Sequence, residues 1–225
     1  MIYLSHVLSA ITPTYGGKDL FNIEKVKKIS NGDTSNNSHI HISSHVGTHI
    51  DAPYHFCDEG RTLDDYPPEF WVCKKPWVID LNIKVNELIS YNSIQDQLNE
   101  IPVLTDILFI RTGFENFRET NEKDKYIFHN PGIDANIGYW LRENKSIKMI
   151  GLDFISLSSY AQREEGRLAH KAFLCNHEKG GVSFDPILII EDMKLINYNR
   201  KIENIIVLPL RIEKADGAPV TVLGW

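Results

Sequence analysis

The sequence predicts an α/β fold with a mixed central β-sheet flanked by helices. Short apolar runs rich in β-branched residues alternate with segments of helical periodicity, which is the pattern of such folds. Each run is short and bounded by polar or turn residues, as buried strands are. The predicted strands cover residues 76–81, 107–111, 147–152, 187–190 and 205–210. A length of 225 residues fits one large domain or two small ones.

Two segments between these runs have helical patterns. Ile133, Ile137, Trp140 and Leu141 are spaced i, i+4, i+7 and i+8, which places them on one apolar face. The second segment, residues 162–174, begins with charged residues and becomes apolar toward its end. Both segments are therefore predicted to be amphipathic helices.

The remaining segments give weaker signals. A third helical pattern lies at 87–98, and within the first 55 residues only 23–29 suggests a helix among short strands and turns. The basic cluster Lys25–Lys28 then reads as a solvated helix face. At the other end, Asp216-Gly217-Ala218-Pro219 predicts a turn that leads into a closing strand over 220–223.

Charge and cysteine content indicate the class of protein. The net charge of −6 argues against a nucleic-acid groove, which needs clustered Lys and Arg. No apolar run approaches the roughly 20 residues needed to span a membrane, and the first residues lack a signal-peptide pattern. Cys57, Cys73 and Cys175 are odd in number and widely spaced, unlike a disulfide framework. These features predict a cytoplasmic protein.

Histidines cluster between residues 39 and 55, where five of the nine in the chain occur. His45, His49, Asp51 and His55 offer imidazole nitrogens and a carboxylate, the ligands that suit zinc, manganese or iron. In a straight strand His45 and His49 would be about 13 Å apart, so we expect the chain to bend at Gly47. His49 and Asp51 can then share one face of a short extended segment.

The alternative interpretation is that these are scattered surface histidines. The density of the cluster, which also contains a carboxylate and a hinge glycine, disfavours that interpretation. His39 and His41 alternate with Ile40 and Ile42, and we expect them to have structural or supporting roles rather than to bind a metal. His6 is expected to be a structural, hydrogen-bonding residue.

The stretch from His45 to Phe56 resembles the H-x-G-T-H-x-D-A-P-x-H-F signature of the cyclase superfamily, which includes bacterial kynurenine formamidase and isatin hydrolase. Similar segments follow along most of the chain, at 110–113, 151–153, 209–212 and 216–220. The resemblance implies a single domain over 1–225 with a swivelling β/β/α fold. It also implies one or two divalent metal ions, zinc first and manganese as the alternative, and a homodimer or higher homo-oligomer.

Carried over residue by residue, the resemblance assigns roles to the motif. His45, His49 and Asp51 would hold the first metal, and His55 matches the general acid/base of the family. A second metal would use a downstream His and Glu, which His170 and Glu191 match.

The segment from Asn176 to Pro186 departs from the formamidases because it lengthens the interval between His170 and Glu191. We expect this segment to be a lid or a dimer contact, and His177 within it competes with His170 as the ligand. Gly16 stands where the family often has proline, and the chain after Asp153 lacks the Asp-Pro of many relatives. Both departures weaken a specific assignment as kynurenine formamidase.

The resemblance implies hydrolysis of a small-molecule substrate at an amide, formamide or cyclic amide bond. A divalent metal would activate water and polarise the carbonyl, and His55 would move the proton. The chain has no G-x-S-x-G elbow, and nothing near Cys57 marks a stabilised thiolate, so serine and cysteine nucleophiles are disfavoured. The alternatives are a metal-dependent cyclase or dehydratase and a non-catalytic metal-binding or small-molecule-binding module.

Aromatic residues are expected to form the walls of the substrate pocket. The predicted residues are Tyr15, Tyr54, Phe56, Phe70, Trp71 and Tyr160.

Overall fold

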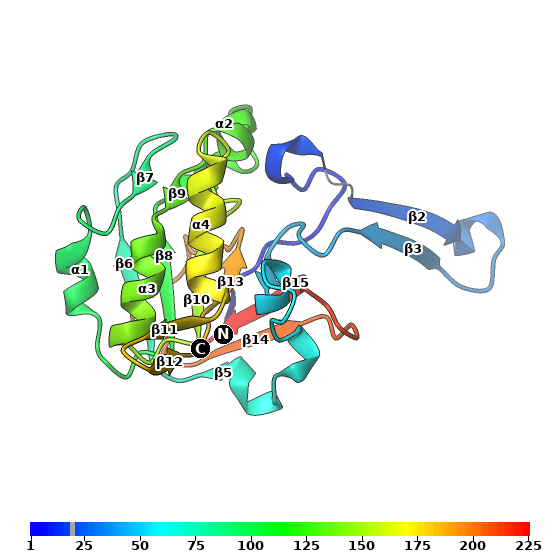
Figure 1. Cartoon of the computed structure of the whole chain (residues 1–225). Coiled ribbons are helices and arrows are strands. Elements are labelled where there is room, and N and C mark those ends of the chain that lie inside the picture. The colour runs from blue at the N-terminus through cyan, green and yellow to red at the C-terminus, as the bar shows by residue number, and fades with distance from the viewer. Residues whose placement is uncertain (19–20) are drawn as a thin grey trace.

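The computed structural model describes residues 1–18 and 21–225, and its centre is a large mixed β-sheet (Figure 1). The strands along this sheet run in the order β5-β14-β15-β4-β13-β10-β8-β6, and β1 pairs with β15. Their bounds are β1 (Ile2–Tyr3), β4 (His49–Asp51), β5 (Val72–Cys73), β6 (Pro76–Asp80), β8 (Ile107–Arg111), β10 (Met149–Leu152), β13 (Leu188–Glu191), β14 (Ile205–Pro209) and β15 (Gly217–Gly224). A mixed α/β architecture is therefore confirmed.

The sheet has a parallel half and an antiparallel half. Strands β6, β8, β10 and β13 are mutually parallel, whereas β4, β15, β14 and β5 pair antiparallel. The two halves meet where β4 pairs antiparallel with β13. The histidine motif at 45–56 supplies β4, so it lies at the junction between the halves.

Side chains of the parallel strands alternate between two apolar cores. Along β8, Leu108 and Ile110 pack into the core under the helices, whereas Ile107 and Phe109 pack into the core under the antiparallel half. Strands buried on both faces read as continuous apolar runs, which is why the sequence predicts them well.

The helices cover one part of the sheet, and α3 and α4 lie side by side there (Figure 1). Both predicted amphipathic helices are confirmed, except that Ile133 lies in a short strand, β9 (Gly132–Ile133), before the first of them. The helices are α1 (Gln95–Glu100), α2 (Lys123–Phe128), α3 (Ala135–Asn144) and α4 (Arg163–Leu174). No helix among residues 1–18 and 21–225 combines the length and apolar character needed to cross a membrane.

Three short strand pairs lie outside the large sheet, and two of them correct the sequence interpretation. They are β2 (Phe21–Lys27) with β3 (Asn37–Ile42), β7 (Leu88–Ile89) with β9 (Gly132–Ile133), and β11 (His177–Lys179) with β12 (Val182–Phe184). The predicted helix at 23–29 is wrong, because this segment is strand β2. Of the pattern at 87–98, only the end from Gln95 is helical.

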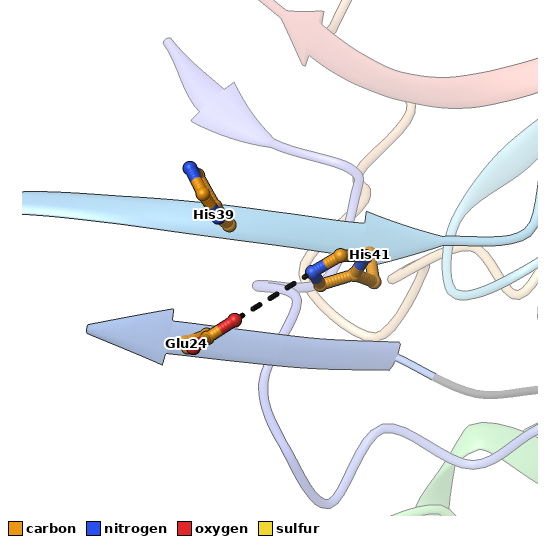
Figure 2. A group of neighbouring side chains, drawn as sticks. All are labelled: Glu24, His39 and His41. Carbon is orange, nitrogen blue, oxygen red and sulfur yellow. Dashed lines mark ion pairs between the residues drawn. The ribbon is translucent and has the colours of Figure 1, made fainter. Parts of the chain in front are cut away.

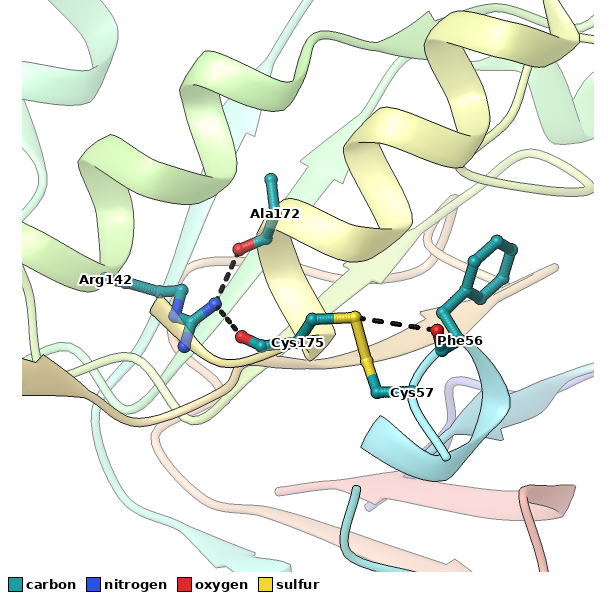
Figure 3. Close-up of a disulfide and its surroundings, with 5 residues drawn as sticks. All are labelled: Phe56, Cys57, Arg142, Ala172 and Cys175. Carbon is teal, nitrogen blue, oxygen red and sulfur yellow. Dashed lines mark hydrogen bonds between the residues drawn. A yellow bond between two sulfur atoms is a disulfide. The ribbon is translucent and has the colours of Figure 1, made fainter. Parts of the chain in front are cut away.

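A disulfide joins Cys57 to Cys175, with Cα atoms 5.7 Å apart (Figure 3). The expectation of unpaired cysteines is therefore wrong for this pair, and only Cys73 is a free, buried thiol. The two cysteines are 118 residues apart, so their pairing depends on the tertiary fold. The cytoplasmic location stays a prediction, and the cysteine argument no longer supports it.

Candidate metal centre

The candidate site is assembled where β4 meets β13. Glu191 pairs across the sheet with His49, and Ile189 pairs with Asp51. His49, Asp51 and Glu191 therefore emerge together at the junction between the two halves of the sheet. His170 comes from α4 and lies against both carboxylates.

The chain reaches this arrangement through the expected bend at Gly47, whose φ of 69° is left-handed. A residue with a Cβ rarely adopts that conformation. The bend brings His45 back toward Asp51, with His45 Nδ1 2.9 Å from Asp51 Oδ1. His49 and Asp51 follow on one face of β4, as predicted.

The donors form two groups at ligand spacing that share Asp51, namely His45, His49 and Asp51, and Asp51, His170 and Glu191. In a tetrahedral site with bonds of about 2.1 Å, neighbouring ligand atoms lie about 3.4 Å apart. His49 Nε2 lies 3.4 Å from Asp51 Oδ1 and 3.4 Å from Glu191 Oε2. His170 Nε2 lies 3.6 Å from Asp51 Oδ2 and 3.5 Å from Glu191 Oε1. These distances exceed ordinary hydrogen bonds and match the separation between ligands.

Both buried imidazoles present the correct nitrogen for metal binding. His49 Nδ1 donates to the Gly47 carbonyl at 2.8 Å, and His170 Nδ1 donates to the Gly166 carbonyl at 2.8 Å. A carbonyl can only accept, so in each ring the proton is on Nδ1 and Nε2 is left for a ligand bond. Such bonds from outside the ligand shell fix ring orientation in metal sites.

Glu191 is also held by neighbours that the sequence did not indicate. The Leu157 amide donates to Glu191 Oε1 at 2.6 Å, and the Ser156 hydroxyl donates to the same oxygen at 3.1 Å. Ser158 Oγ lies 3.3 Å from His170 Nδ1. The structure therefore places Ser156 and Ser158 around the predicted ligands.

Asp216 is the site residue that sequence reasoning missed. Its Oδ2 lies 2.8 Å from His45 Nε2 and 3.2 Å from His55 Nδ1. Asp216 precedes Gly217, which pairs with Asp51 across β15 and β4. A Cβ at Gly217 would lie 2.5 Å from His45 Cε1, so the first residue of β15 must be glycine for packing.

His55 lies beside the predicted ligands, as the motif suggested. Its ring stacks on His45 with centroids 3.8 Å apart. The contact with Asp216 places a proton on Nδ1, so Nε2 is an acceptor. Burial lowers the pKa of His55, outweighing the attraction of Asp51, which favours the neutral ring.

The carboxylates of the metal-free site favour positive charge on the neighbouring imidazoles. Burial lowers the pKa of His45 and His170, but hydrogen bonds and charge attraction from Asp51, with Asp216 or Glu191, raise these values to about 9 and about 10. The pKa of buried His49 is also raised, because Asp51 outweighs desolvation. Burial opposes the ionisation of Asp51, yet bonds from His170 and His45 hold its pKa well below its usual range.

These shifts predict that metal affinity rises with pH. Below about pH 9, His45 and His170 hold protons in the metal-free protein, and a metal ion must displace them. The apparent zinc affinity should therefore increase from pH 6 to pH 9 and level off once these imidazoles are neutral. Titration calorimetry in buffers of different ionisation enthalpy should measure more than one proton released per zinc at pH 7. Release of no proton would contradict ligation through these imidazoles.

The ligand cluster opens into a cavity of about 290 Å³. Its walls include Tyr15, Phe56 and Ile155, together with the predicted ligands and His55. Tyr15 and Phe56 therefore lie where the sequence predicted. Tyr160 lies outside the cavity but packs edge-on against Tyr15, with centroids 5.5 Å apart.

The other predicted walls are wrong. Tyr54 is 43% exposed, and it does not line the cavity. Phe70 and Trp71 pack with Tyr66 in the core beneath the antiparallel half of the sheet. Their aromatic character reflects that core rather than the pocket.

Three further histidines lie away from the centre. His177 belongs to the β11–β12 hairpin, where its Nε2 lies 2.9 Å from Glu143 Oε1, so the structure brings His170 and not His177 into the cluster. His39 and His41 are on the projecting β2–β3 hairpin with Glu24, in a separate, exposed group (Figures 1 and 2). They do not support the ligands, contrary to expectation.

Comparisons with known proteins match most of the chain. A family model described as "Putative cyclase" matches residues 2–159. Cyclase-like protein 3 of Oryza sativa subsp. japonica is 26% identical over 202 residues, covering 84% of this chain but only 66% of that protein. Kynurenine formamidase of Bacillus thuringiensis (strain Al Hakam) is 29% identical over 219 residues, covering 97% of this chain and 94% of that enzyme.

A solved structure shows the same fold. Isatin hydrolase A from Labrenzia aggregata, bound to benzyl benzoate, superposes with a TM-score of 0.79 at 20% identity. The match covers 99% of this chain and 92% of that one. Because the family model matches well over half of the sequence, this chain belongs to the cyclase family.

Proposed function

We propose that this protein is a metal-dependent hydrolase that cleaves the C–N bond of an amide, formamide or cyclic amide, as an arylformamidase does. The observation that carries the proposal is a pair of donor groups that share the buried Asp51, beside a cavity that also holds His55. The groups are His45, His49 and Asp51, and Asp51, His170 and Glu191. The named activities of the kynurenine formamidase and isatin hydrolase relatives support the same reaction class.

In this proposal one set of residues binds the metal and another residue transfers the proton. His45, His49, Asp51, His170 and Glu191 hold one or two divalent ions, most simply zinc, with manganese as the alternative. Asp51 belongs to both groups of donors, so it is the residue that would bridge two ions. A bound ion of this kind supplies an activated water and a polarised carbonyl.

His55 moves the proton of the reaction. With Nδ1–H directed at Asp216, its Nε2 accepts a proton from the attacking water and returns it to the leaving nitrogen. The new bond joins the water oxygen to the carbonyl carbon, and the bond that breaks is C–N. Asp216 holds the imidazole in the tautomer that this transfer requires.

Replacing His55 with glutamine tests this role. We expect kcat to fall about 10²–10⁴-fold, the usual contribution of a general base, while bound metal stays the same. Steady-state kinetics and metal analysis by mass spectrometry measure the two quantities. His129→Gln, at an exposed position away from the cavity, is the matched control and should retain wild-type kinetics. Unchanged kcat in the His55 variant would exclude the proposed proton transfer.

The cavity supports a small substrate with an apolar or aromatic group. A volume of about 290 Å³ lies at the lower limit of ligand pockets, and Tyr15, Phe56 and Ile155 provide apolar surface. N-formylated aromatic amines and cyclic aryl amides are therefore the first compounds to assay.

Product mass distinguishes the proposed reaction from the competing ones. Hydrolysis adds the mass of water to the substrate, whereas a cyclase or dehydratase removes it or leaves the composition unchanged. Chelation should abolish turnover, and zinc or manganese should restore it. The non-catalytic alternative predicts a different result. In that case the protein's own residues would fill every coordination position of the metal, and no compound would be turned over.

The family resemblance further leads us to propose a homodimer and a swivelling β/β/α arrangement. Apolar side chains on the projecting β2–β3 hairpin support self-association, since Ile23 and Ile40 are 40% and 63% exposed. Light scattering coupled to size-exclusion chromatography measures the mass of the assembly.

A further inference from the structure

The Cys57–Cys175 disulfide connects the two segments that bring His55 and His170 to the candidate site. Cys57 lies two residues after His55, and Cys175 immediately follows α4, which carries His170 (Figure 3). Phe56, next to Cys57, stacks on the His170 ring with centroids 4.4 Å apart and a 16° angle between planes. The bridge is therefore one residue from a direct contact with a predicted ligand.

The loop on the Cys57 side has mainly local hydrogen bonds. Within the part of the chain that the structure describes, the backbone amides of Tyr54, His55, Phe56, Cys57 and Gly60 all donate to carbonyls between residues 52 and 61. Such bonds shape the loop but do not attach it to α4. Its attachments across the cavity are the ring contacts of His55 and Phe56, the His55–Asp216 bond and the disulfide.

The helix on the Cys175 side is firmly anchored. Arg142 Nη1 donates to the Ala172 carbonyl at 2.8 Å and to the Cys175 carbonyl at 2.7 Å (Figure 3). The same guanidinium donates to the Phe184 and Asp185 carbonyls at 2.6 and 2.9 Å. The end of α4 is thus bound to α3 and to the β11–β12 hairpin. The disulfide connects this anchored end to the loop that carries Cys57.

We propose that the Cys57–Cys175 disulfide positions His55 and Phe56 over the metal centre, and that its reduction by a dithiol lowers turnover. The effect on turnover rests on the proposed hydrolase function, whereas the positioning does not. In the reduction, a thiolate of the dithiol attacks one sulfur and forms a mixed disulfide, which the second thiol resolves. Two electrons and two protons arrive, leaving two cysteine thiols and an oxidised dithiol.

Both sulfurs belong to partly exposed residues, so a reductant has access to the bond. Cys57 is followed by exposed Asp58, and Cys175 by exposed Asn176. The third cysteine, Cys73, is fully buried in the other core, so exchange with it is disfavoured. The bond can therefore break and form again between the same partners.

The experiment compares the oxidised holoenzyme with the reduced one. Intact mass and thiol counting should show one free thiol before phosphine reduction and three after it. On reduction we expect kcat to fall about tenfold with unchanged metal content, since a misplacement of about 1 Å can cost up to about a hundredfold. KM should change less than kcat. Amide hydrogen exchange should rise at residues 53–60 and stay unchanged in β8 and β10.

Two variants distinguish the positioning of the 53–60 loop by the disulfide from other effects of the reductant. The double variant C57S/C175S should have the low kcat and fast exchange of the reduced enzyme and should not respond to the phosphine. Cys73→Ala keeps the bond and should respond as wild type does.

Three outcomes would overturn the proposal: three free thiols in the protein purified without reductant, complete reduction with unchanged exchange at 53–60, or complete reduction with unchanged kcat. If no substrate is hydrolysed in any state, the hydrolase function fails, and the exchange at 53–60 alone decides whether the bond positions the loop.

Discussion

Replacing Asp51 with asparagine is expected to remove the bound metal and to lower kcat/KM about 10³-fold or more. Asp51 is buried and belongs to two of the groups of possible ligands, so its loss removes a ligand from both. A thousandfold loss corresponds to about 4 kcal/mol of transition-state stabilisation, within what a catalytic metal provides. Metal analysis of the purified variant and steady-state kinetics measure the two effects.

Asp96→Asn is the matched control for this substitution. Asp96 is an exposed carboxylate in the first turn of α1, far along the chain from the centre. The control should keep wild-type metal content and kinetics. An Asp51 variant with full metal content and unchanged kcat/KM would show that the reaction does not depend on this carboxylate.

The largest stability effect is expected at Arg118, which pairs with Asp192, the residue after Glu191. Arg118 Nε and Nη2 donate to the two Asp192 oxygens at 2.7 and 2.8 Å, and both side chains are 2% exposed. Tyr126 donates to the same carboxylate. Arg118→Met leaves a buried carboxylate without its counter-charge, which typically costs about 3–5 kcal/mol. Urea unfolding in the presence of a chelator measures this loss separately from metal binding.

Two further variants serve as controls for the Arg118 prediction. Arg167→Met removes an exposed arginine paired with Glu164 on α4, and such pairs contribute about 0–1 kcal/mol. The double variant R118M/D192N should recover part of the lost stability, because it removes the unpaired charge as well. If Arg118→Met lowered the free energy of unfolding no more than Arg167→Met, the buried ion pair would not stabilise the fold.

Much of the centre could be predicted because its residues are close in sequence or follow clear patterns. His45, His49 and Asp51 lie within seven residues around a glycine bend, and backbone geometry alone brings them together. His170 lies on an amphipathic helix, and Glu191 ends an apolar strand. Those two were reached through the family resemblance, since nothing local joins them to β4.

Asp216 and the disulfide could not be predicted because both depend on long-range pairing. Asp216 reads as a turn residue, and only the antiparallel pairing of β15 with β4 brings it to His45 and His55. Cys57 and Cys175 meet because α4 packs beside the motif loop, and their spacing in the sequence gives no sign of this.

The β2 strand was mistaken for a helix for a local reason. A strand should alternate apolar and polar residues, but the register shifts between Lys25 and Lys27. The shift interrupts the alternation, so that Ile23, Val26 and Ile29 fall at helical spacing. Irregular strands of this kind imitate helices in pattern analysis.

Anomalous diffraction from crystals of the protein grown with zinc tests the central claim most directly. We expect a strong peak at the zinc edge bonded to His45, His49 and Asp51, or to Asp51, His170 and Glu191, or one peak at each group, with a position left for water or substrate. Data collected below the edge should lose that peak. A zinc peak found only at the exposed group of Glu24, His39 and His41, or no peak at all in fully active protein, would contradict a catalytic metal centre at β4.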